Sequence, residues 1–257
     1  MRLSYLQTSF VGQQFQFLPI CASTNAEAHA ELVKNDATPE GLTILADEQT
    51  AGRGQRGNAW QAAAGENLTF SVVLRPTFLP VGQQFALSIA VALAGFDTLR
   101  AVLGRGVAAW VKWPNDLYVG NRKVGGVLIE NTVRGNFLAS SIVGIGLNVN
   151  QTAFGSDLGG ATSLALEAGW ELDREQVLTT LLGALEARYL ALRGGAAERQ
   201  QAEYLARLYR YGEQATFGFE GRTAAGRITG VDERGQLVVA LAEGERAFGV
   251  QEVRFLD

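Results

Sequence analysis

The stretch DEQTAGRGQRGNAW, residues 47–60, alternates glycines with two arginines and ends on a tryptophan. Glycines allow the backbone to approach a ligand closely. Arg53 and Arg56 add forked, permanently charged donors that suit carboxylate and phosphate groups. The stretch therefore predicts a mobile, cationic loop that can fold over an anion.

The spacing Gly52-x-Gly54-x-x-Gly57 also matches the dinucleotide-binding pattern. That pattern requires a helix after the glycines and an acidic residue about 20 positions further on. Residues 58–74 instead predict a turn followed by a β-strand. Residues 76–78, where the acidic residue would lie, contain no carboxylate. We therefore interpret the match to a Rossmann dehydrogenase as accidental.

Length and composition are those of a globular protein with one sizeable domain and a small one. The chain has 257 residues, of which 47% are hydrophobic and 19% charged, and its net charge of −4 does not indicate a dedicated DNA-binding protein. The single Cys21 excludes an internal disulfide, and one cysteine with one histidine cannot form a zinc site of the usual kind. Without a signal peptide or an uncharged apolar run long enough to span a bilayer, we expect a cytoplasmic protein outside the membrane.

Residues 23–25, Ser-Thr-Asn, lead into a predicted helix at residues 26–35. Thr24 and Glu27 fit a capping box, in which the hydroxyl and the carboxylate satisfy each other's backbone amides. This interpretation accounts for Thr24 and leaves Ser23 and Asn25 partly free. A helix cap and a ligand site therefore both stay open for this segment.

The stretch VKWPNDLYVGNRKVGGVLIE, residues 111–130, gathers charged side chains around its turns. Pro114 ends the first strand, and the Asn115-Asp116 pair that follows is typical of a turn that presents a carboxylate. A solvated turn and a part of an anion site are both possible interpretations, and the glycine-arginine loop favours the second. The candidates for that site are Lys112, Asp116, Lys123, Gly125 and Gly126.

The remainder of the chain alternates predicted strands and helices and then becomes entirely β-like. Residues 137–149 predict a long strand with Asn148 near its end, where open α/β sheets place ligand groups. Further strands are predicted at 42–46 and 67–74, and helices at 83–103, 173–192 and 197–211. From Glu213 on, short segments separated by Gly or charged turns predict a small antiparallel barrel or sandwich. We place the domain boundary near Tyr211-Gly212, which gives domains 1–211 and 212–257.

The glycine-arginine loop and residues 112–130 together resemble the bacterial biotin protein ligases, also called biotin–[acetyl-CoA-carboxylase] ligases. The segments STN at 23–25, GIGLNVN at 144–150 and ATSL at 161–164 fit the same family in the same order. The resemblance covers nearly the whole chain. It implies an α/β (α+β) catalytic domain with a mixed sheet flanked by helices, followed by a small SH3-like β-barrel. It also implies the form of the family without the N-terminal DNA-binding domain.

The activity that this resemblance implies is a two-step ligation. Enzymes of the family join biotin to ATP, forming biotinyl-5′-AMP and pyrophosphate, and then pass the biotinyl group to a lysine of a carboxylase carrier domain. The resemblance therefore implies biotin, ATP and Mg²⁺ as ligands and a biotin carboxyl carrier domain as partner. We expect no specific DNA binding, and a homodimer is possible.

The site residues follow from the same resemblance, position by position. It implies catalytic roles for Arg53, Asp116 and Lys123. The implied biotin-binding residues are Ser23, Thr24, Asn25, Gln49, Arg53, Gly54, Gln55, Lys123 and Gly125. The implied ATP-binding residues are Arg56, Trp60, Lys112, Asn115, Asp116 and Asn148, and the implied metal ligands are Asp116 and Asn148. Many relatives carry arginine where this chain has Gln55, so the loop lacks one cation.

Two other functions compete with this interpretation. A lipoate–protein ligase or octanoyltransferase has a related fold, but those proteins usually show an arginine-glycine motif ending in a histidine, and His29 lies far from the loop. A catalytically silent module that binds the carrier domain is the second alternative. The presence of Arg53, Asp116 and Lys123 argues against it.

Overall fold

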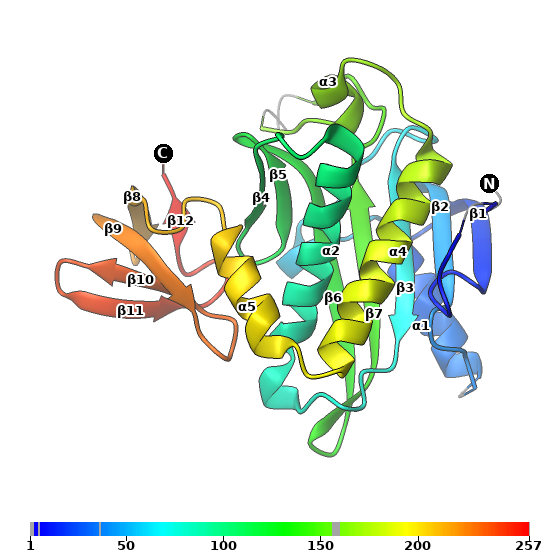
Figure 1. Cartoon of the computed structure of the whole chain (residues 1–257), viewed down its shortest axis with the longest axis horizontal. Helices are drawn as coiled ribbons and strands as arrows, with labels where there is room; N and C mark the ends of the chain where they lie inside the picture. Colours follow the sequence, from blue (N-terminus) through cyan, green and yellow to red (C-terminus); the bar gives the residue numbers. More distant parts are fainter. Residues whose placement is uncertain (1–2, 5, 36, 156–159, 257) are drawn as a thin grey trace.

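The computed structural model describes residues 3–4, 6–35, 37–155 and 160–256, and it contains two β-sheets (Figure 1). The larger sheet has seven strands in the order β1-β2-β3-β7-β6-β5-β4. Because β1 runs parallel to β2 while the other neighbours are antiparallel, this sheet is mixed. Its strands are β1 (Phe15–Cys21), β2 (Thr43–Gln49), β3 (Leu68–Leu74), β4 (Ala109–Lys112), β5 (Asp116–Val119), β6 (Arg122–Arg134) and β7 (Phe137–Leu147).

Helices cover both faces of this sheet, as predicted. The α-helices are α1 (Thr24–Lys34), α2 (Phe85–Leu103), α3 (Leu164–Ala168), α4 (Arg174–Arg193) and α5 (Ala197–Ala206). Two short 3₁₀ turns, η1 (Gln55–Gly57) and η2 (Val81–Gln83), lie in the connections. In Figure 1, α2 and α4 lie side by side over one face of the sheet, and α1 lies behind it.

The alternation of side chains along β3 explains why the two faces differ. Phe70 and Val72 point into the main core beneath α2 and α4, and both are fully buried. Thr69 and Ser71 point to the opposite face, because successive side chains of a strand alternate. There, Ala28 of α1 packs in a second, smaller apolar cluster. The part of this opposite face that carries Thr69 and Ser71 becomes the polar floor of the candidate site.

The main core is built around α2. The segment Val81–Leu103 is long and apolar enough to cross a membrane by length and composition, but 61% of its most apolar window is buried inside the fold. Its apolar side chains pack against the larger sheet and against α4. Burial of apolar surface on this scale is the main favourable term in folding, so the composition of α2 is explained by its central position.

The N-terminal segment is fastened to α4 by one carboxylate. The Glu186 carboxylate accepts hydrogen bonds from the backbone N–H groups of Ser9 (2.6 Å), Phe10 (2.8 Å) and Val11 (2.9 Å). Burial raises the pKa of Glu186, but these backbone donors outweigh burial and hold the pKa below its ordinary value. The ionised form of Glu186 therefore stabilises the fold.

The C-terminal segment forms a separate five-stranded antiparallel sheet in the order β11-β10-β9-β8-β12. Its strands are β8 (Gln214–Phe219), β9 (Arg222–Val231), β10 (Leu237–Leu241), β11 (Gly244–Phe248) and β12 (Arg254–Phe255). The expected mixed sheet flanked by helices with a small β unit after it is therefore confirmed. Division into two domains at Tyr211-Gly212 stays a prediction.

The two sheets are joined by contacts of Gly235. The indole N–H of Trp113 donates to the Gly235 carbonyl at 2.9 Å. Gly235 has φ 82°, and a Cβ there would lie 2.4 Å from Cδ2 of Phe85. Both the backbone conformation and the lack of space require glycine at this position.

Two local predictions are wrong. The helix α1 begins at Thr24 with Ser23 as N-cap, and no side-chain cap hydrogen bond forms there among the described residues, so the capping box of Thr24 and Glu27 is absent. The Thr24 hydroxyl instead contacts Gln49 of β2 and Ser71 of β3. The helix predicted to reach residue 211 ends at Ala206, where Val111 and Leu208 form an isolated parallel bridge.

Candidate active site

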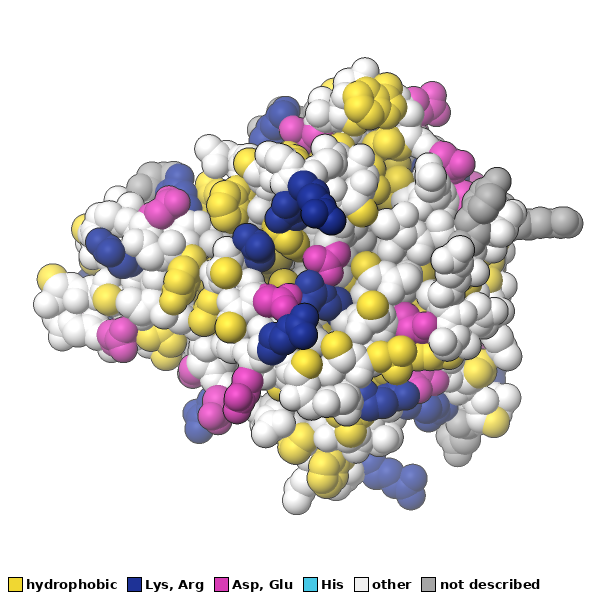
Figure 2. Space-filling view, viewed as in Figure 1, with side chains coloured by type: hydrophobic (Ala, Val, Ile, Leu, Met, Phe, Trp, Pro, Cys, Tyr) yellow, Lys and Arg dark blue, Asp and Glu magenta, His cyan; other side chains and the backbone are white. Residues whose placement is uncertain are grey.

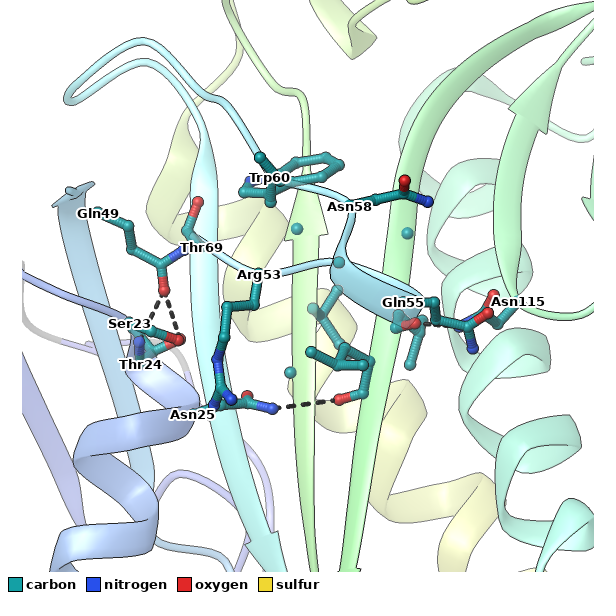
Figure 3. A pocket seen from close by; sticks show the side chains of 18 of the residues that line it. Ser23, Thr24, Asn25, Gln49, Arg53, Gln55, Asn58, Trp60, Thr69 and Asn115 are labelled. Atoms are coloured by element: carbon teal, nitrogen blue, oxygen red, sulfur yellow. Dashed lines mark hydrogen bonds between the residues drawn. The ribbon is translucent and has the colours of Figure 1, made fainter. Parts of the chain in front are cut away.

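A pocket lies on the polar face of the larger sheet, beside the start of α1 and beneath the glycine-arginine loop (Figure 3). Its walls come from the loop after β2, from the turn before β5, and from β3, β6 and β7. Eleven of the residues implied by the family resemblance line it: Ser23, Thr24, Asn25, Gln49, Arg53, Gly54, Gln55, Trp60, Asn115, Asp116 and Lys123. Residues up to 100 positions apart in the sequence, which the family resemblance assigns to one site, therefore line one pocket.

The floor of the pocket is formed by small residues on paired strands. Thr69 and Ser71 of β3 lie opposite Gly146 and Gly144 of β7. A Cβ on Gly144 would lie 2.3 Å from Oδ1 of Asn25, and one on Gly146 would lie 2.3 Å from Cε2 of Trp60. The two glycines thus make room for the two side chains that wall the pocket. No larger residue fits without displacing them.

A continuous hydrogen-bond network crosses this floor, and Figure 3 shows the part of it between Gln49 and Thr24. Oε1 of Gln49 accepts from the backbone N–H of Thr24 at 2.7 Å and from its hydroxyl at 3.1 Å. The Ser71 hydroxyl lies 2.8 Å from the Thr24 hydroxyl and donates to Oδ1 of Asn25 at 2.6 Å. Nδ2 of Asn25 donates to Oε2 of Glu130 at 2.6 Å.

The network fixes the side chains that a ligand would meet. Thr24 and Asn25 are each only 3% exposed, so their rotamers are locked by packing as well as by hydrogen bonds. Since Oε1 of Gln49 is occupied by Thr24, the Gln49 amide nitrogen is the donor left for a ligand. The arrangement is preorganised to bind a polar group.

The glycine-arginine loop folds back on itself above the floor. The backbone N–H of Gly54 donates to the Asn58 carbonyl at 2.7 Å, and that of Trp60 donates to the Gly52 carbonyl at 3.0 Å. A Cβ on Gly52 would lie 2.4 Å from the Trp60 carbonyl oxygen, so the close approach of the two loop arms requires glycine. The dinucleotide-binding interpretation is therefore excluded structurally, because only the short turn η1 and the strand β3 follow the glycines.

The loop also brings an arginine to a carboxylate that the sequence did not indicate. Nη2 of Arg53 lies 3.1 Å from Oε2 of Glu130, with side-chain exposures of 49% and 39%. Because Glu130 also binds Asn25, it connects the loop to the floor network. The side chain of Arg56, another predicted ligand, lies outside the described part of the structure.

Lys123 and Asp116 form the second ion pair of the site. Nζ of Lys123 lies 2.7 Å from Oδ1 of Asp116. A Cβ on Gly126 would lie 3.1 Å from that carboxylate oxygen and 3.4 Å from the lysine Nζ, so the glycine leaves the pair its space. The Lys123 backbone is held by residues 160–162: its N–H donates to the Gly160 carbonyl at 2.7 Å, and its carbonyl accepts from the Thr162 N–H at 2.8 Å.

Lys112 does not line the pocket. Its ammonium lies over the rings of Tyr118, Tyr209 and Phe255, at 5.0, 5.8 and 5.2 Å from their centroids. Burial lowers the pKa of Lys112. The nearby positive charges of Lys123 and Arg210 lower it further, whereas the Asp116 carboxylate raises it. Lys112 therefore lies in an aromatic cage between the larger sheet and β12, where cation–π attraction holds it.

Two further predicted residues lie behind the pocket wall. The side of Gly125 that lacks a Cβ faces Leu117 and Leu147 in the core, and its neighbour Gly126 lines the pocket instead. Asn148 is 4% exposed and donates from Nδ2 to the Thr162 carbonyl at 3.0 Å. Its Oδ1 is buried and has no hydrogen-bond partner among the described residues. Such an unsatisfied acceptor is rare in a native fold, which makes it a candidate ligand contact.

The residues that could hold a metal ion are few. Among the described residues, no group of three His, Cys, Asp or Glu side chains comes together. Asp116 is the one acidic side chain among the described residues that line the pocket. This fits Mg²⁺, which usually binds through one or two carboxylates together with substrate phosphates, and does not fit a metal held by protein side chains alone.

Sequence reasoning missed Thr69, Ser71 and Glu130. Thr69 and Ser71 carried a signal, because two small polar side chains two positions apart in an apolar strand predict one polar face. Glu130 carried none, because its contact with Arg53 depends on the register of β6 in the sheet and on the path of the loop.

Comparison with known proteins shows which family the chain resembles. The model of the family described as "Biotin/lipoate A/B protein ligase family" matches residues 18–148. The biotin–[acetyl-CoA-carboxylase] ligase of Paracoccus denitrificans is 35% identical over 244 residues, which cover 91% of this chain and 97% of that protein.

A longer relative and a solved structure are also similar. The bifunctional ligase/repressor BirA of Bacillus spizizenii is 36% identical over 187 residues, and the match covers 72% of this chain and 56% of that protein. The chain thus spans little more than half of its length. A biotin protein ligase from Aquifex aeolicus, solved in complex with biotin and ATP, matches with a TM-score of 0.78 at 25% identity, covering 95% of this chain and 98% of that one.

Proposed function

Because the chain belongs to the biotin/lipoate A/B protein ligase family, we propose that it activates biotin with ATP and transfers the biotinyl group to a carrier-domain lysine. The observation that carries the proposal is the pocket itself. A locked polar floor at Gln49, Thr24 and Asn25 adjoins two cations, Arg53 and Lys123. Biotin likewise has a polar ureido group at one end and a carboxylate at the other.

The polar floor suits the ureido end of biotin. The free amide nitrogen of Gln49 donates to the ureido oxygen, and the hydroxyl of Ser23, which is 5% exposed, lies beside it in the pocket wall. Leu128 of β6 lines the pocket and supplies an apolar wall for the ring system. A few fixed polar groups in an otherwise apolar wall are typical of small-molecule sites.

The two cations suit the reacting end. In the first step a biotin carboxylate oxygen bonds to the α-phosphorus of ATP, and the bond from that phosphorus to the β-phosphate oxygen breaks, so pyrophosphate leaves. Both reactants are anions, so positioning and charge neutralisation dominate catalysis. Lys123 is placed between the two anions, and Arg53 of the loop neutralises the charge from above.

The second step is acyl transfer. The amine of the carrier lysine attacks the biotinyl carbonyl carbon, AMP leaves, and the amine loses a proton. Until the carrier arrives, the loop that contains Arg53 and Gln55 shields the mixed anhydride from water. The named relatives, which are biotin ligases, favour biotin over lipoate and octanoate as the acyl group.

The nucleotide end of the site rests on fewer contacts. Asp116 is the residue that would bind Mg²⁺ together with the triphosphate, and the bound ion would neutralise phosphate charge. Asn148 offers its unsatisfied Oδ1, and Asn115 lines the pocket next to Asp116. Trp60 packs near the adenine, and Lys112 reaches the phosphates only if it leaves its aromatic cage.

The proposal extends to partners and location. The proposed acceptor is a biotin carboxyl carrier domain, and the proposed location is the cytoplasm. The protein does not bind DNA specifically, because the net charge of −4 does not favour the phosphate backbone.

Pyrophosphate exchange into ATP tests the function directly. Wild-type protein is incubated with Mg²⁺ and labelled pyrophosphate, with biotin, lipoate and octanoate in parallel. Exchange that depends on biotin alone supports the proposal, and mass spectrometry of a carrier domain then shows one added biotinyl group. Exchange with lipoate or octanoate but not biotin, by folded protein, overturns it.

A further inference from the structure

We propose that a hollow on the helical side of the molecule binds a small anion that carries phosphate groups. The hollow lies between α2, α4 and α5, on the face of the larger sheet opposite the candidate active site. Figure 2 shows basic side chains gathered around acidic ones near the middle of this face. The cavity volume of ≈ 480 Å³ is within the roughly 300–1,000 Å³ of small-molecule sites.

The lining has an excess of positive charge. Four arginines and two carboxylates line the hollow, in a chain whose net charge is −4. Both carboxylates are bound by Arg188: its Nε and Nη2 donate to Asp97 at 2.7 and 3.2 Å, and its Nη1 donates to Glu203. These three side chains therefore satisfy one another and join α2, α4 and α5.

The other three arginines, Arg100, Arg105 and Arg207, have no carboxylate partner within the described part of the chain. Two of them are nonetheless fixed in place. The guanidinium groups of Arg100 and Arg207 lie over the same Phe96 ring, at 5.8 and 5.2 Å from its centroid. Nη2 of Arg100 also donates to the Arg105 carbonyl at 2.7 Å. Side chains ordered in advance lose less entropy when a ligand binds.

The chemistry of these groups selects the ligand. Guanidinium is planar and binds phosphate oxygens in pairs, and three uncompensated cations suit a ligand with more than one negative charge. Leu93 and Phe96 form an apolar base beneath the charged rim.

The test uses inorganic pyrophosphate as the probe, measured by isothermal titration calorimetry at low ionic strength. The candidate active site would also bind this probe, so all variants carry Arg53→Gln and Lys123→Gln. In that background we expect binding to remain, and adding Arg100→Gln with Arg207→Gln to weaken it by at least about tenfold, or 1.4 kcal/mol. The matched control adds Arg134→Gln with Arg234→Gln, which removes the same charge at two exposed positions elsewhere.

The outcomes separate the hollow from general charge effects. Retention within twofold after loss of Arg100 and Arg207, or equal weakening by the control pair, overturns the proposal. So does binding of an acidic peptide such as polyglutamate in place of pyrophosphate, since that indicates a protein partner. Thermal unfolding checks that each variant folds. If the protein that carries Arg100→Gln and Arg207→Gln is unfolded, a single Arg105→Gln in the same background must weaken pyrophosphate binding, while Arg134→Gln in that background must not.

Discussion

Replacing Lys123 with alanine should remove most of the adenylation activity. Lys123 is the one lysine in the described pocket lining; its ammonium lies 2.7 Å from Asp116, and its backbone is hydrogen-bonded to residues 160–162. Two unit charges about 4 Å apart interact by roughly 4 kcal/mol at the effective dielectric of a protein surface. Loss of a preorganised donor to a transition state typically costs about 2.7–4 kcal/mol, or roughly 100- to 1000-fold in rate.

Pyrophosphate exchange and single-turnover formation of the adenylate measure this loss. The pair is about one-third exposed, with side-chain exposures of 36% and 31%, so its contribution to folding is below about 1 kcal/mol. Lys123→Ala should therefore fold normally and fail in chemistry. Thermal unfolding of Lys123→Ala and of Asp116→Asn, each of which breaks the pair, checks that its loss does not unfold the protein. A Lys123→Ala rate within threefold of wild type would refute the assigned role.

Three further predictions concern the floor, the loop and the N-terminal segment. Gly144→Ala places a Cβ 2.3 Å from Oδ1 of Asn25, so the free energy of biotin binding should weaken by about 1–3 kcal/mol. Gly183→Ala is the control, because no neighbouring side chain that the structure describes lies within 4 Å of the new Cβ, and it should leave biotin affinity unchanged. Calorimetry with biotin measures both variants. Gln55→Gly should speed dissociation of biotinyl-AMP, measured by stopped flow, because it removes a side chain that lines the pocket and frees the backbone. If release is unchanged, that side chain is not a latch. Glu186→Gln should lower the free energy of unfolding by about 1–3 kcal/mol at pH 7. Since the folded-state pKa of Glu186 is lowered, this contribution is present above the unfolded pKa near 4.5 and disappears as the pH falls through the folded pKa. Urea unfolding at both ends of that range should show the two proteins converging in acid, and a difference that persists there contradicts the argument.

Much of the architecture could be predicted because it depends on local patterns. The apolar run at residues 83–103 forms the core helix α2, and the helix predicted at 173–192 forms as α4, with Asp173 as its N-cap accepting from the N–H groups of Glu175 and Gln176. The site could be located because its motifs lie at strand ends and in one glycine-rich loop. These features need no knowledge of which strands pair.

The missed features depend on register and on distant segments. Adjacent glycines at 125 and 126 look equivalent in sequence, but strand alternation turns Gly125 to the core and Gly126 to the pocket. Lys112 was expected at the phosphates, yet Phe255, far along the chain, completes an aromatic cage around it. The capping box failed because tertiary contacts to Gln49 and Ser71 bind the Thr24 hydroxyl.

Both cations assigned to the reaction already have carboxylate partners in this structure: Arg53 with Glu130 and Lys123 with Asp116. An incoming anion must therefore exchange partners with a carboxylate, and it gains only the difference between two ion pairs. Because both pairs are partly exposed, each stabilises the protein by about 0–1 kcal/mol, so breaking a pair to bind an anion costs little free energy. The carboxylates hold the cations in position without trapping them. The locked floor at Gln49, Thr24 and Asn25 must then supply most of the affinity for biotin, and the cations act chiefly in the transition state, where interactions raise the rate.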